Sequence, residues 1–371
     1  MTRILPLVPI LFGLTACGSD PAAPGSGEPT FPVDFTPDLQ GFGARLDTLR
    51  VEHTIPGMSA AIVEDGQIVW SRGLGFADVA AAKPATESTC FHLASLTKPF
   101  ASVIIMQLVE EGLLDLDDPV SDYGIDLSSQ GVILVRHLLT HTSEGVPGSG
   151  YSYNGSRFGQ LDRVIEGASG RTFGELLVER ILRPLHLTHT APSPSSPADF
   201  VLTDLNRDEF LANMAVPYER RGSRVARSEY ATGFSSAAGL ISSADDMAAF
   251  ASAIDQGMFL EADTWQAVLT PAVSNSGSDL PYGLGWFVQQ RQGVELQWHY
   301  GYWNAASTLI IRVPAVGRTF IVMANTDMMS RPYELGAGDV WRSPFARLFL
   351  ESYVYGDDPL PHAAVKRPSP G

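Results

Sequence analysis

A serine and a lysine three residues apart, Ser95 and Lys98, are the pair in this sequence best suited to covalent chemistry. At that spacing on a helix both side chains project from one face, about one turn apart. A serine hydroxyl is a weak nucleophile at neutral pH, and a lysine amine accepts its proton only when burial or a nearby cation lowers the lysine pKa. The pair therefore indicates acyl transfer, with Ser95 as nucleophile and Lys98 as its base.

The surroundings of Lys98 strengthen this interpretation. The chain contains three lysines, Lys83, Lys98 and Lys366, and Lys98 lies at the start of an apolar run. A lysine inside such a run needs a reason to be there. The alternative is that Ser95 only caps a helix and that Lys98 extends along the surface to solvent.

Other catalytic chemistries find less support in the sequence. His137 and His141, and likewise His186 and His189, have spacings that place two imidazoles on one helix face, but no His-Glu-x-x-His pattern accompanies them. The chain also has no Gly-x-Ser-x-Gly elbow and no Gly-Lys-Ser/Thr phosphate loop. Cys90 has no nucleophile signature around it, and we expect a small buried side chain. The sequence predicts neither a metal nor a cofactor.

The elements that must position Ser95 and Lys98 can be predicted from hydrophobic patterning. Two β-branched runs between Gly57 and Trp70, separated by Glu64-Asp65-Gly66, predict an antiparallel hairpin. The stretch from Ser95 to Glu111 is apolar on nearly every face and stops at Gly112, as a buried helix with a glycine C-cap does.

Further strands and one further helix are predicted toward the C-terminus. Ser243 to Asp246 has the form of a capping box and opens a helix that runs through Ala253 and ends at Gly257. Alternating apolar runs then predict antiparallel strands at residues 285–288, 307–311 and 318–323, with a turn at 314–317.

Strand segments at both ends with helices between them predict the fold class. Residues 100–230 have the short helices and Gly-, Ser- and Pro-rich turns of a mainly helical lobe, and no repeat of fixed period is present. We therefore expect an α/β (α+β) fold at residues 38–355, in which helices flank an antiparallel sheet. Residues 356–371 would form a C-terminal tail.

Several motifs together resemble the serine β-lactamase and penicillin-binding-protein superfamily, nearest its class C β-lactamase, D-alanyl-D-alanine carboxypeptidase and esterase-like branch. The similarity runs from about Gly57 to Asp327. It is carried by the opening strand pair and by the segments 91–98, 108–119, 137–143, 183–187 and 282–286. The resemblance implies a β-lactamase/transpeptidase-like fold and a Ser-x-x-Lys nucleophile at Ser95.

The resemblance also implies a tyrosine beside the nucleophile as a proton shuttle. Tyr153-Asn154-Gly155 occupies the position of the family's Tyr-x-Asn element, and Tyr153 is the expected phenol, with Tyr151 as the alternative. Glycine stands where asparagine is usual, which leaves Asn154 as a substitute donor to the substrate carbonyl.

The third family element matches His299-Tyr300-Gly301 on an inner strand. The resemblance implies that His299 supplies a hydrogen bond or partial positive charge near the substrate and that Gly301 lets the substrate backbone approach. The N–H groups of Ser95 and Tyr302 would form the oxyanion hole. Tyr302 and Trp303 would give the site an aromatic, apolar mouth, although Trp303 could instead pack beneath the strand.

These residues predict a serine hydrolase that forms a covalent acyl-enzyme on a small ester, amide or peptidoglycan-like peptide. Because His299 replaces the family's lysine, we expect esterase or D-alanyl-D-alanine carboxypeptidase-like activity rather than efficient β-lactamase activity. The rival hypothesis is a non-catalytic cell-envelope lipoprotein that binds ligands with the same fold.

The N-terminal residues predict export and a lipid anchor. Arg3 precedes an apolar run from Ile4 to Leu14, and the run ends in a lipobox-like sequence before Cys17. Residues 1–17 would be a lipoprotein signal peptide and residues 18–37 a flexible tether. We expect secretion across the inner membrane and a cell-envelope lipoprotein held to the membrane through lipid on Cys17. The formal net charge of -16 argues against a nucleic-acid partner.

Overall fold

A seven-stranded antiparallel sheet is the largest element in the computed structural model, which describes residues 38–222 and 224–356. Its strand order is β3-β2-β1-β12-β11-β10-β9, so strands from the two ends of the chain meet where β1 pairs with β12. The strands are β1 (Gly57–Glu64), β2 (Gln67–Asp78), β3 (Lys83–Pro84), β9 (Phe287–Arg291), β10 (Val294–Trp303), β11 (Ala306–Val313) and β12 (Arg318–Ala324).

The predicted hairpin is confirmed as β1 and β2. Asp65 and Gly66 form its turn with φ of 50° and 74°, the pair of positive values that a type I′ turn requires. The strands predicted near residues 307–311 and 318–323 are confirmed as β11 and β12, and the first predicted strand lies slightly later than expected, in β9.

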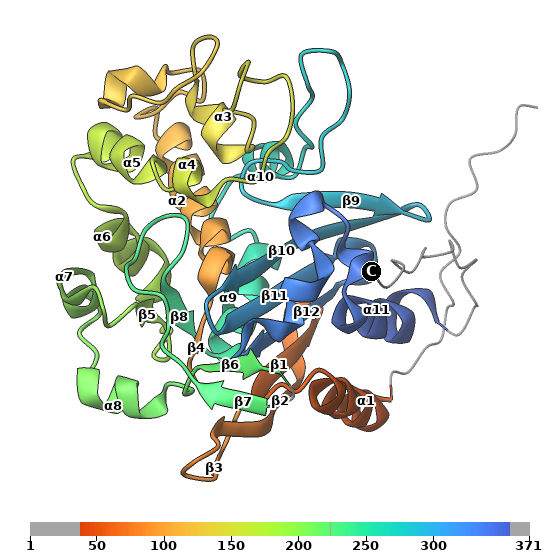
Figure 1. Ribbon diagram of the computed structural model, residues 1–371. Coiled ribbons are helices and arrows are strands. Elements are labelled where there is room, and N and C mark those ends of the chain that lie inside the picture. The colour runs from red at the N-terminus through yellow and green to blue at the C-terminus, as the bar shows by residue number, and fades with distance from the viewer. Residues whose placement is uncertain (1–37, 223, 357–371) are drawn as a thin grey trace, which may run out of the picture. The chain divides into compact units, whose positions relative to one another are not determined.

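Both faces of the sheet are covered by helices (Figure 1). On β1, Met58, Ala60 and Ile62 join one hydrophobic core beneath the terminal helices α1 (Leu39–Glu52) and α11 (Pro344–Leu350). Ala61 and Val63 alternate with them and join the second core, which includes α9 (Ala244–Asp255). Burial on both faces explains why β1 is a continuous run of small and branched apolar residues rather than an alternating one.

The segment that carries Ser95 differs from the predicted single helix. A 3₁₀ turn, η1 (Ala94–Thr97), comes first, and the α-helix α2 (Lys98–Glu110) begins only at Lys98. Pro99 lies in the first turn of α2, where its missing N–H removes no helical hydrogen bond. The predicted C-terminal glycine is confirmed, because Gly112 has φ of 69°.

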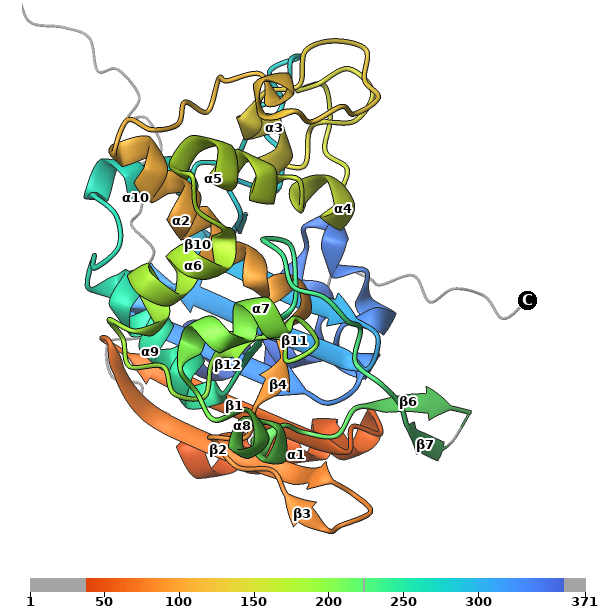
Figure 2. The same ribbon diagram turned by 90° about the vertical axis from the view of Figure 1, so that its left-hand side faces the viewer.

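The middle of the chain contains short helices together with strands that the sequence analysis missed. The three-stranded sheet described there has the order β4-β8-β5, and a β6–β7 hairpin projects away from the main sheet (Figure 2). These strands are short and lack a long alternating pattern, which is why patterning alone indicated only helices and loops. Their bounds are β4 (Phe91–His92), β5 (Ala191–Pro192), β6 (Tyr218–Arg221), β7 (Arg224–Arg227) and β8 (Leu240–Ser242). The helices and turns are η2 (Val120–Tyr123), α3 (Val135–Leu139), α4 (Gly155–Phe158), α5 (Leu161–Ser169), α6 (Phe173–Leu177), η3 (Val178–Leu182), α7 (Pro197–Phe200), η4 (Val201–Thr203) and α8 (Arg207–Asn213).

The predicted helix after Ser243 is confirmed as α9, but only half of its capping box forms. Ser243 Oγ accepts from the backbone N–H of Asp246 at 3.2 Å. The Asp246 carboxylate instead accepts from the N–H of His189 and the hydroxyl of Thr190. It therefore links α9 to the residues directly before β5. The remaining elements are α10 (Ala262–Val268), η5 (Pro314–Val316), η6 (Asp327–Met329), η7 (Arg331–Tyr333), η8 (Leu335–Ala337), η9 (Val340–Arg342) and η10 (Glu351–Tyr355).

The predicted signal peptide, tether and lipidated Cys17 lie outside the described residues, as does the tail after Gly356. Within the part of the chain that the structure describes, no helix combines the length and apolarity needed to span a bilayer.

Candidate active site

Ser95 lies in a strained turn whose other residues are all buried. Ala94, directly before it, has φ of 50°, a value that non-glycine residues seldom adopt. The N–H of Ala94 donates to Nδ1 of buried His92 at 2.9 Å, which helps to hold this backbone. Ser95 itself is partly exposed. Ser95 is therefore the one residue of this turn that solvent can reach.

Lys98 is completely buried, so the alternative that its side chain extends to solvent is wrong. Its amine donates to the carbonyl oxygen of Ala237 at 2.9 Å and lies 5.1 Å from the ring centre of Tyr153 and 5.2 Å from that of Phe158. Burial lowers the pKa of Lys98 from 10.5 to about 7. Near pH 7 a substantial fraction of this amine is neutral and able to accept a proton.

The two candidate tyrosines have different environments. The hydroxyl of Tyr151 donates to the carbonyl oxygen of Gly336 at 3.0 Å, away from the nucleophile. The hydroxyl of Tyr153 is buried with no hydrogen-bond partner among the described residues. Burial raises the pKa of Tyr153 well above 10, and the nearby Ser95 hydroxyl partly opposes that rise. Tyr153 has the hydroxyl without a partner among the described residues and the pKa that Ser95 affects, so it stays the expected proton shuttle.

Asn154 is not free to bind substrate, contrary to the prediction. Its Nδ2 donates to Glu144 at 2.5 Å, and its Oδ1 caps α4 by accepting the N–H of Arg157 at 3.0 Å. Both ends of the amide are thus used inside the protein. A Cβ on Gly155 would lie 4.0 Å from the Lys98 amine, so the glycine leaves room beside the base where the family has asparagine.

His299 lies on β10 near Tyr153 with both ring nitrogens engaged. Nδ1 donates to the carbonyl oxygen of Tyr300 at 2.8 Å, and Nε2 accepts from the hydroxyl of Tyr282 at 2.8 Å. Burial and the Lys98 charge hold the pKa of His299 well below 6.5. The expected partial positive charge on this ring is therefore absent, because His299 is neutral with both nitrogens occupied by protein groups.

Gly301 is required by the close packing of the protein itself. A Cβ at this position would lie 2.0 Å from the carbonyl oxygen of Leu93 and 2.2 Å from Oγ1 of Thr308. That same carbonyl accepts the Thr308 hydroxyl at 2.8 Å. The glycine thus allows β10 to lie directly against the segment that leads into Ser95. Its expected role in the approach of a substrate backbone stays a prediction.

Tyr302 and Trp303 follow at the exposed end of β10, with exposed fractions of 46% and 36%. Trp303 packs edge-on against His92, with ring centres 5.6 Å apart, and Tyr230 stacks on the same imidazole at 5.4 Å. Trp303 therefore lies beside His92 and does not pack beneath the strand. The aromatic mouth of the site stays a prediction.

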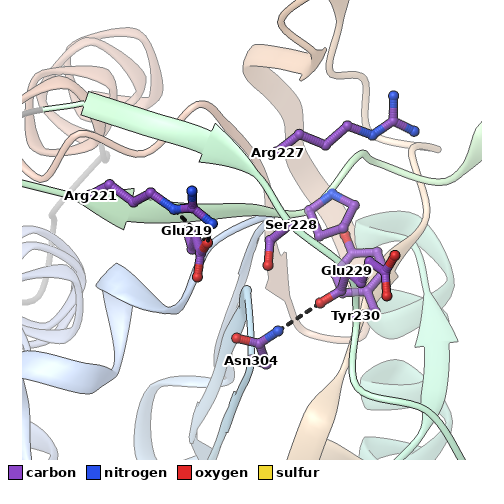
Figure 3. A pocket seen from close by; sticks show the side chains of 8 residues that line it. Glu219, Arg221, Arg227, Ser228, Glu229, Tyr230 and Asn304 are labelled. Carbon is purple, nitrogen blue, oxygen red and sulfur yellow. Dashed lines mark hydrogen bonds and ion pairs between the residues drawn. The ribbon is translucent and has the colours of Figure 1, made fainter.

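A groove of about 790 Å³ opens beyond Tyr230 (Figure 3). One wall is the β6–β7 hairpin, where Arg221 pairs with Glu219 at 2.8 Å. The other wall is the β10–β11 turn, where Asn304 donates to the backbone carbonyl of Glu229 at 2.7 Å. The groove is lined by Pro217, Glu219, Arg221, Arg227, Ser228, Glu229, Tyr230 and Asn304.

The first of the two histidine pairs considered for metal binding holds backbone groups. His137 and His141 each accept a backbone N–H at Nδ1, from Leu134 at 3.0 Å and from Asn154 at 3.2 Å. Among residues 38–222 and 224–356, no group of three or more His, Cys, Asp or Glu side chains is placed to hold a metal ion. Cys90 is buried as expected, and burial raises its thiol pKa to about 12.

Three contributors to the site were missed from the sequence. The Ala237 carbonyl is a backbone group without a sequence signature, and Asp162 supports it by accepting the N–H of Ser236 at 2.7 Å. The role of His92 is seen only from the hydrogen bond that the Ala94 N–H donates to it. Its position three residues before Ser95 was the one available signal.

Comparison with known proteins places this arrangement in a family. A family model described as Beta-lactamase matches residues 41–338. The chain belongs to the beta-lactamase family. The matched range contains Ser95, Lys98, Tyr153 and His299, so each predicted catalytic residue lies in the part of the chain that defines membership.

The relatives to which this chain is similar include a penicillin-binding protein and a D-aminopeptidase. A penicillin-binding protein of Bacillus subtilis (strain 168) is 26% identical over 323 residues, covering 76% of this chain and 70% of the relative. A D-aminopeptidase of Brucella canis is 27% identical over 308 residues, covering 71% of this chain and 55% of the relative. The chain thus spans between 55% and 70% of these relatives' length.

A solved structure supports the fold assignment to the beta-lactamase family. The octameric penicillin-binding protein homologue from Pyrococcus abyssi superposes with a TM-score of 0.70 at 23% identity, covering 81% of this chain and 76% of that chain. The antiparallel sheet with flanking helices is the predicted β-lactamase/transpeptidase-like fold, which is confirmed.

Proposed function

We propose that this protein is a serine acyl hydrolase that acts through a covalent acyl-enzyme on Ser95. The observation that carries the proposal is the burial of Lys98, which lowers its pKa to about 7 and makes the amine a base at neutral pH. The hydroxyl of Tyr153, which has no hydrogen-bond partner among the described residues, is a second group that can relay the proton from Ser95.

The reaction has two halves. Ser95 Oγ attacks the substrate carbonyl while its proton passes through Tyr153 to Lys98, and a tetrahedral intermediate forms. The proton then returns to the leaving alcohol or amine as the carbonyl bond to that group breaks and the acyl-enzyme remains. Water repeats the sequence in the second half and releases the acid. We expect the N–H groups of Ser95 and Tyr302 to hold the oxyanion.

The substrate class follows from the polarity around the nucleophile. Neutral His299 offers no fixed cation for the carboxylate that a β-lactam or a peptide C-terminus carries. Exposed Tyr302 and Trp303 instead favour an apolar or aromatic acyl group. The preferred substrates are therefore esters, with D-amino-acid amides second, as the D-aminopeptidase relative suggests. Efficient β-lactam hydrolysis is not expected.

The cellular setting is proposed from the N-terminal sequence. Export, cleavage before Cys17 and lipid attachment there would place the enzyme in the cell envelope, tethered by residues 18–37. Metabolic labelling with an alkyne-bearing fatty acid tests this, because Cys17→Ser should abolish incorporation while secretion of the chain continues.

A substrate panel with Ser95→Ala as control tests the activity. Wild type should hydrolyse p-nitrophenyl esters faster than D-alanyl p-nitroanilide and far faster than a chromogenic cephalosporin. A fluorophosphonate probe should label wild type but not Ser95→Ala. If wild type and Ser95→Ala are equally inert toward the panel and the probe, the enzyme proposal fails and the non-catalytic ligand-binding lipoprotein replaces it.

A further inference from the structure

His141 occupies an unusual backbone position next to the proposed proton relay. It lies just after α3 with φ of 55°, although it is not glycine, and its side chain is buried. Such a conformation persists only where surrounding contacts impose it, and it is enriched at functional sites. The reaction proposed above assigns His141 no part.

The contacts that impose this conformation lie on either side of Tyr153. The carbonyl oxygen of His141 accepts the N–H of Ser152 at 2.8 Å, and its Nδ1 accepts the N–H of Asn154 at 3.2 Å. One residue thus binds the backbone immediately before and immediately after Tyr153. Its ring also packs on the Tyr153 ring, with centres 4.3 Å apart.

The protonation state of His141 suits this arrangement. Because Nδ1 accepts a hydrogen bond, the neutral ring carries its proton on Nε2. Burial and, after it, the nearby Lys98 charge hold the pKa of His141 well below 6.5. Nε2 is buried without a hydrogen-bond partner among the described residues. The Nδ1 acceptor that holds the Asn154 N–H is therefore present in the neutral ring.

We propose that His141 is a positioning residue that holds the Tyr153 hydroxyl beside Ser95. The inference rests on the proposed acyl-transfer function and adds to it the group that fixes the phenol. His141 touches neither substrate nor reacting atoms in this role. Its effect on the reaction passes entirely through the backbone at residues 152–154 and the Tyr153 ring.

Two substitutions of His141 separate positioning from folding. Asparagine tolerates positive φ, and its Oδ1 can replace Nδ1 as acceptor for the Asn154 N–H. Leucine has similar bulk but no acceptor. We expect His141→Leu to lower kcat for a p-nitrophenyl ester by about 10²-fold or more with KM changed only a few-fold. His141→Asn should recover activity to within about tenfold of wild type. Thermal unfolding of both variants checks that they fold.

A double-mutant cycle with Tyr153→Phe makes the test decisive. If His141 acts through the phenol, His141→Leu should cause no further loss of kcat in the Tyr153→Phe background. The same loss in both backgrounds, or full activity of folded His141→Leu, would overturn the inference while leaving the proposed function intact. An inert wild type would overturn the proposed function and this inference with it.

Discussion

The amine of Lys98 donates to the backbone carbonyl of Ala237, 2.9 Å away, and this is its one hydrogen bond to the described protein. An ammonium has three donors, so its charged form is poorly compensated at this buried position. The neutral form needs less compensation. The fold therefore favours the protonation state in which Lys98 can serve as a base.

Activity should rise with pH through the pKa of Lys98. Since the amine must be neutral to accept the Ser95 proton, kcat/KM for a neutral ester should increase with pH and reach half its plateau near pH 7. A pH–rate profile of wild type between pH 5 and 9 measures this. A profile that is flat across that range would show that Lys98 is not the base.

Replacing Lys98 by methionine should remove activity and raise stability. Because burial lowers the pKa from 10.5 to about 7, the unfolded chain holds more protons between these values, and wild-type stability rises with pH across that window. Below pH 7 the buried charge costs the fold at most about 5 kcal/mol. Lys98→Met should therefore be more stable than wild type at pH 6 in urea unfolding, and its advantage should shrink toward pH 10. Its acylation rate should fall by about 10²- to 10⁴-fold.

Tyr153 and Tyr151 form a matched pair of controls. Tyr153→Phe removes a hydroxyl that has no hydrogen-bond partner in the described protein, so it should leave stability nearly unchanged and lower kcat by about 10²-fold or more. Tyr151→Phe breaks the bond to Gly336, so it should cost about 1 kcal/mol of stability and leave kcat within a few-fold of wild type. Steady-state kinetics and urea unfolding of both variants measure this. The reverse pattern would assign the phenol to Tyr151.

The fold and the burial of Lys98 could be predicted from the sequence because their signals are local. Asp65-Gly66 specifies its turn through φ, and a lone lysine at the start of an apolar helix requires burial or an unusual partner. Lys98 is buried as that reasoning required. The exact start of α2 could not be predicted, since the N–H of Ala94 binds His92 and the η1 turn packs against β10.

The surroundings of the site could not be predicted because they depend on long-range pairing. Gly301 was assigned to substrate approach, yet the close neighbour is Leu93, more than two hundred residues earlier. His299 was expected to face substrate, but Tyr282 occupies its Nε2. No spacing rule in one sequence reports which groups tertiary packing places beside such residues.

Two substitutions should distinguish Gly301, where a side chain would clash with the backbone, from Gly155, where there is room for one. Gly301→Ala forces a Cβ into the Leu93 carbonyl, so we expect a loss of about 1–3 kcal/mol or more and reduced activity from displacement of the Ser95 turn. Gly155→Ala meets only the Lys98 amine at 4.0 Å and should retain full stability and activity within a few-fold. Urea unfolding and ester hydrolysis distinguish the two. Equal tolerance at both positions would contradict the close packing of β10 against this turn.

Asp162 should make stability fall as pH rises from about 4 to 6. Burial raises its pKa from 3.8 to about 6, so in this window the folded protein holds a proton that the unfolded chain has lost. The effect is at most about 3 kcal/mol. Asp162→Asn keeps an acceptor for the Ser236 N–H and cannot ionise. The free energy of unfolding of wild type minus that of this variant should therefore decline as the pH rises from about 4 to 6. Unfolding at pH 4 and pH 7 tests the sign.

Asp162→Ala extends the same test to the active site. Without an acceptor for the Ser236 N–H, the neighbouring Ala237 carbonyl loses its support and the Lys98 amine loses a fixed partner. The midpoint of the pH–rate profile should then move, whereas Asp162→Asn should leave it near pH 7. Coincident profiles for Asp162→Ala and wild type would mean that the Ala237 carbonyl is held independently of Asp162, and the connection from α5 to Lys98 would have to be abandoned.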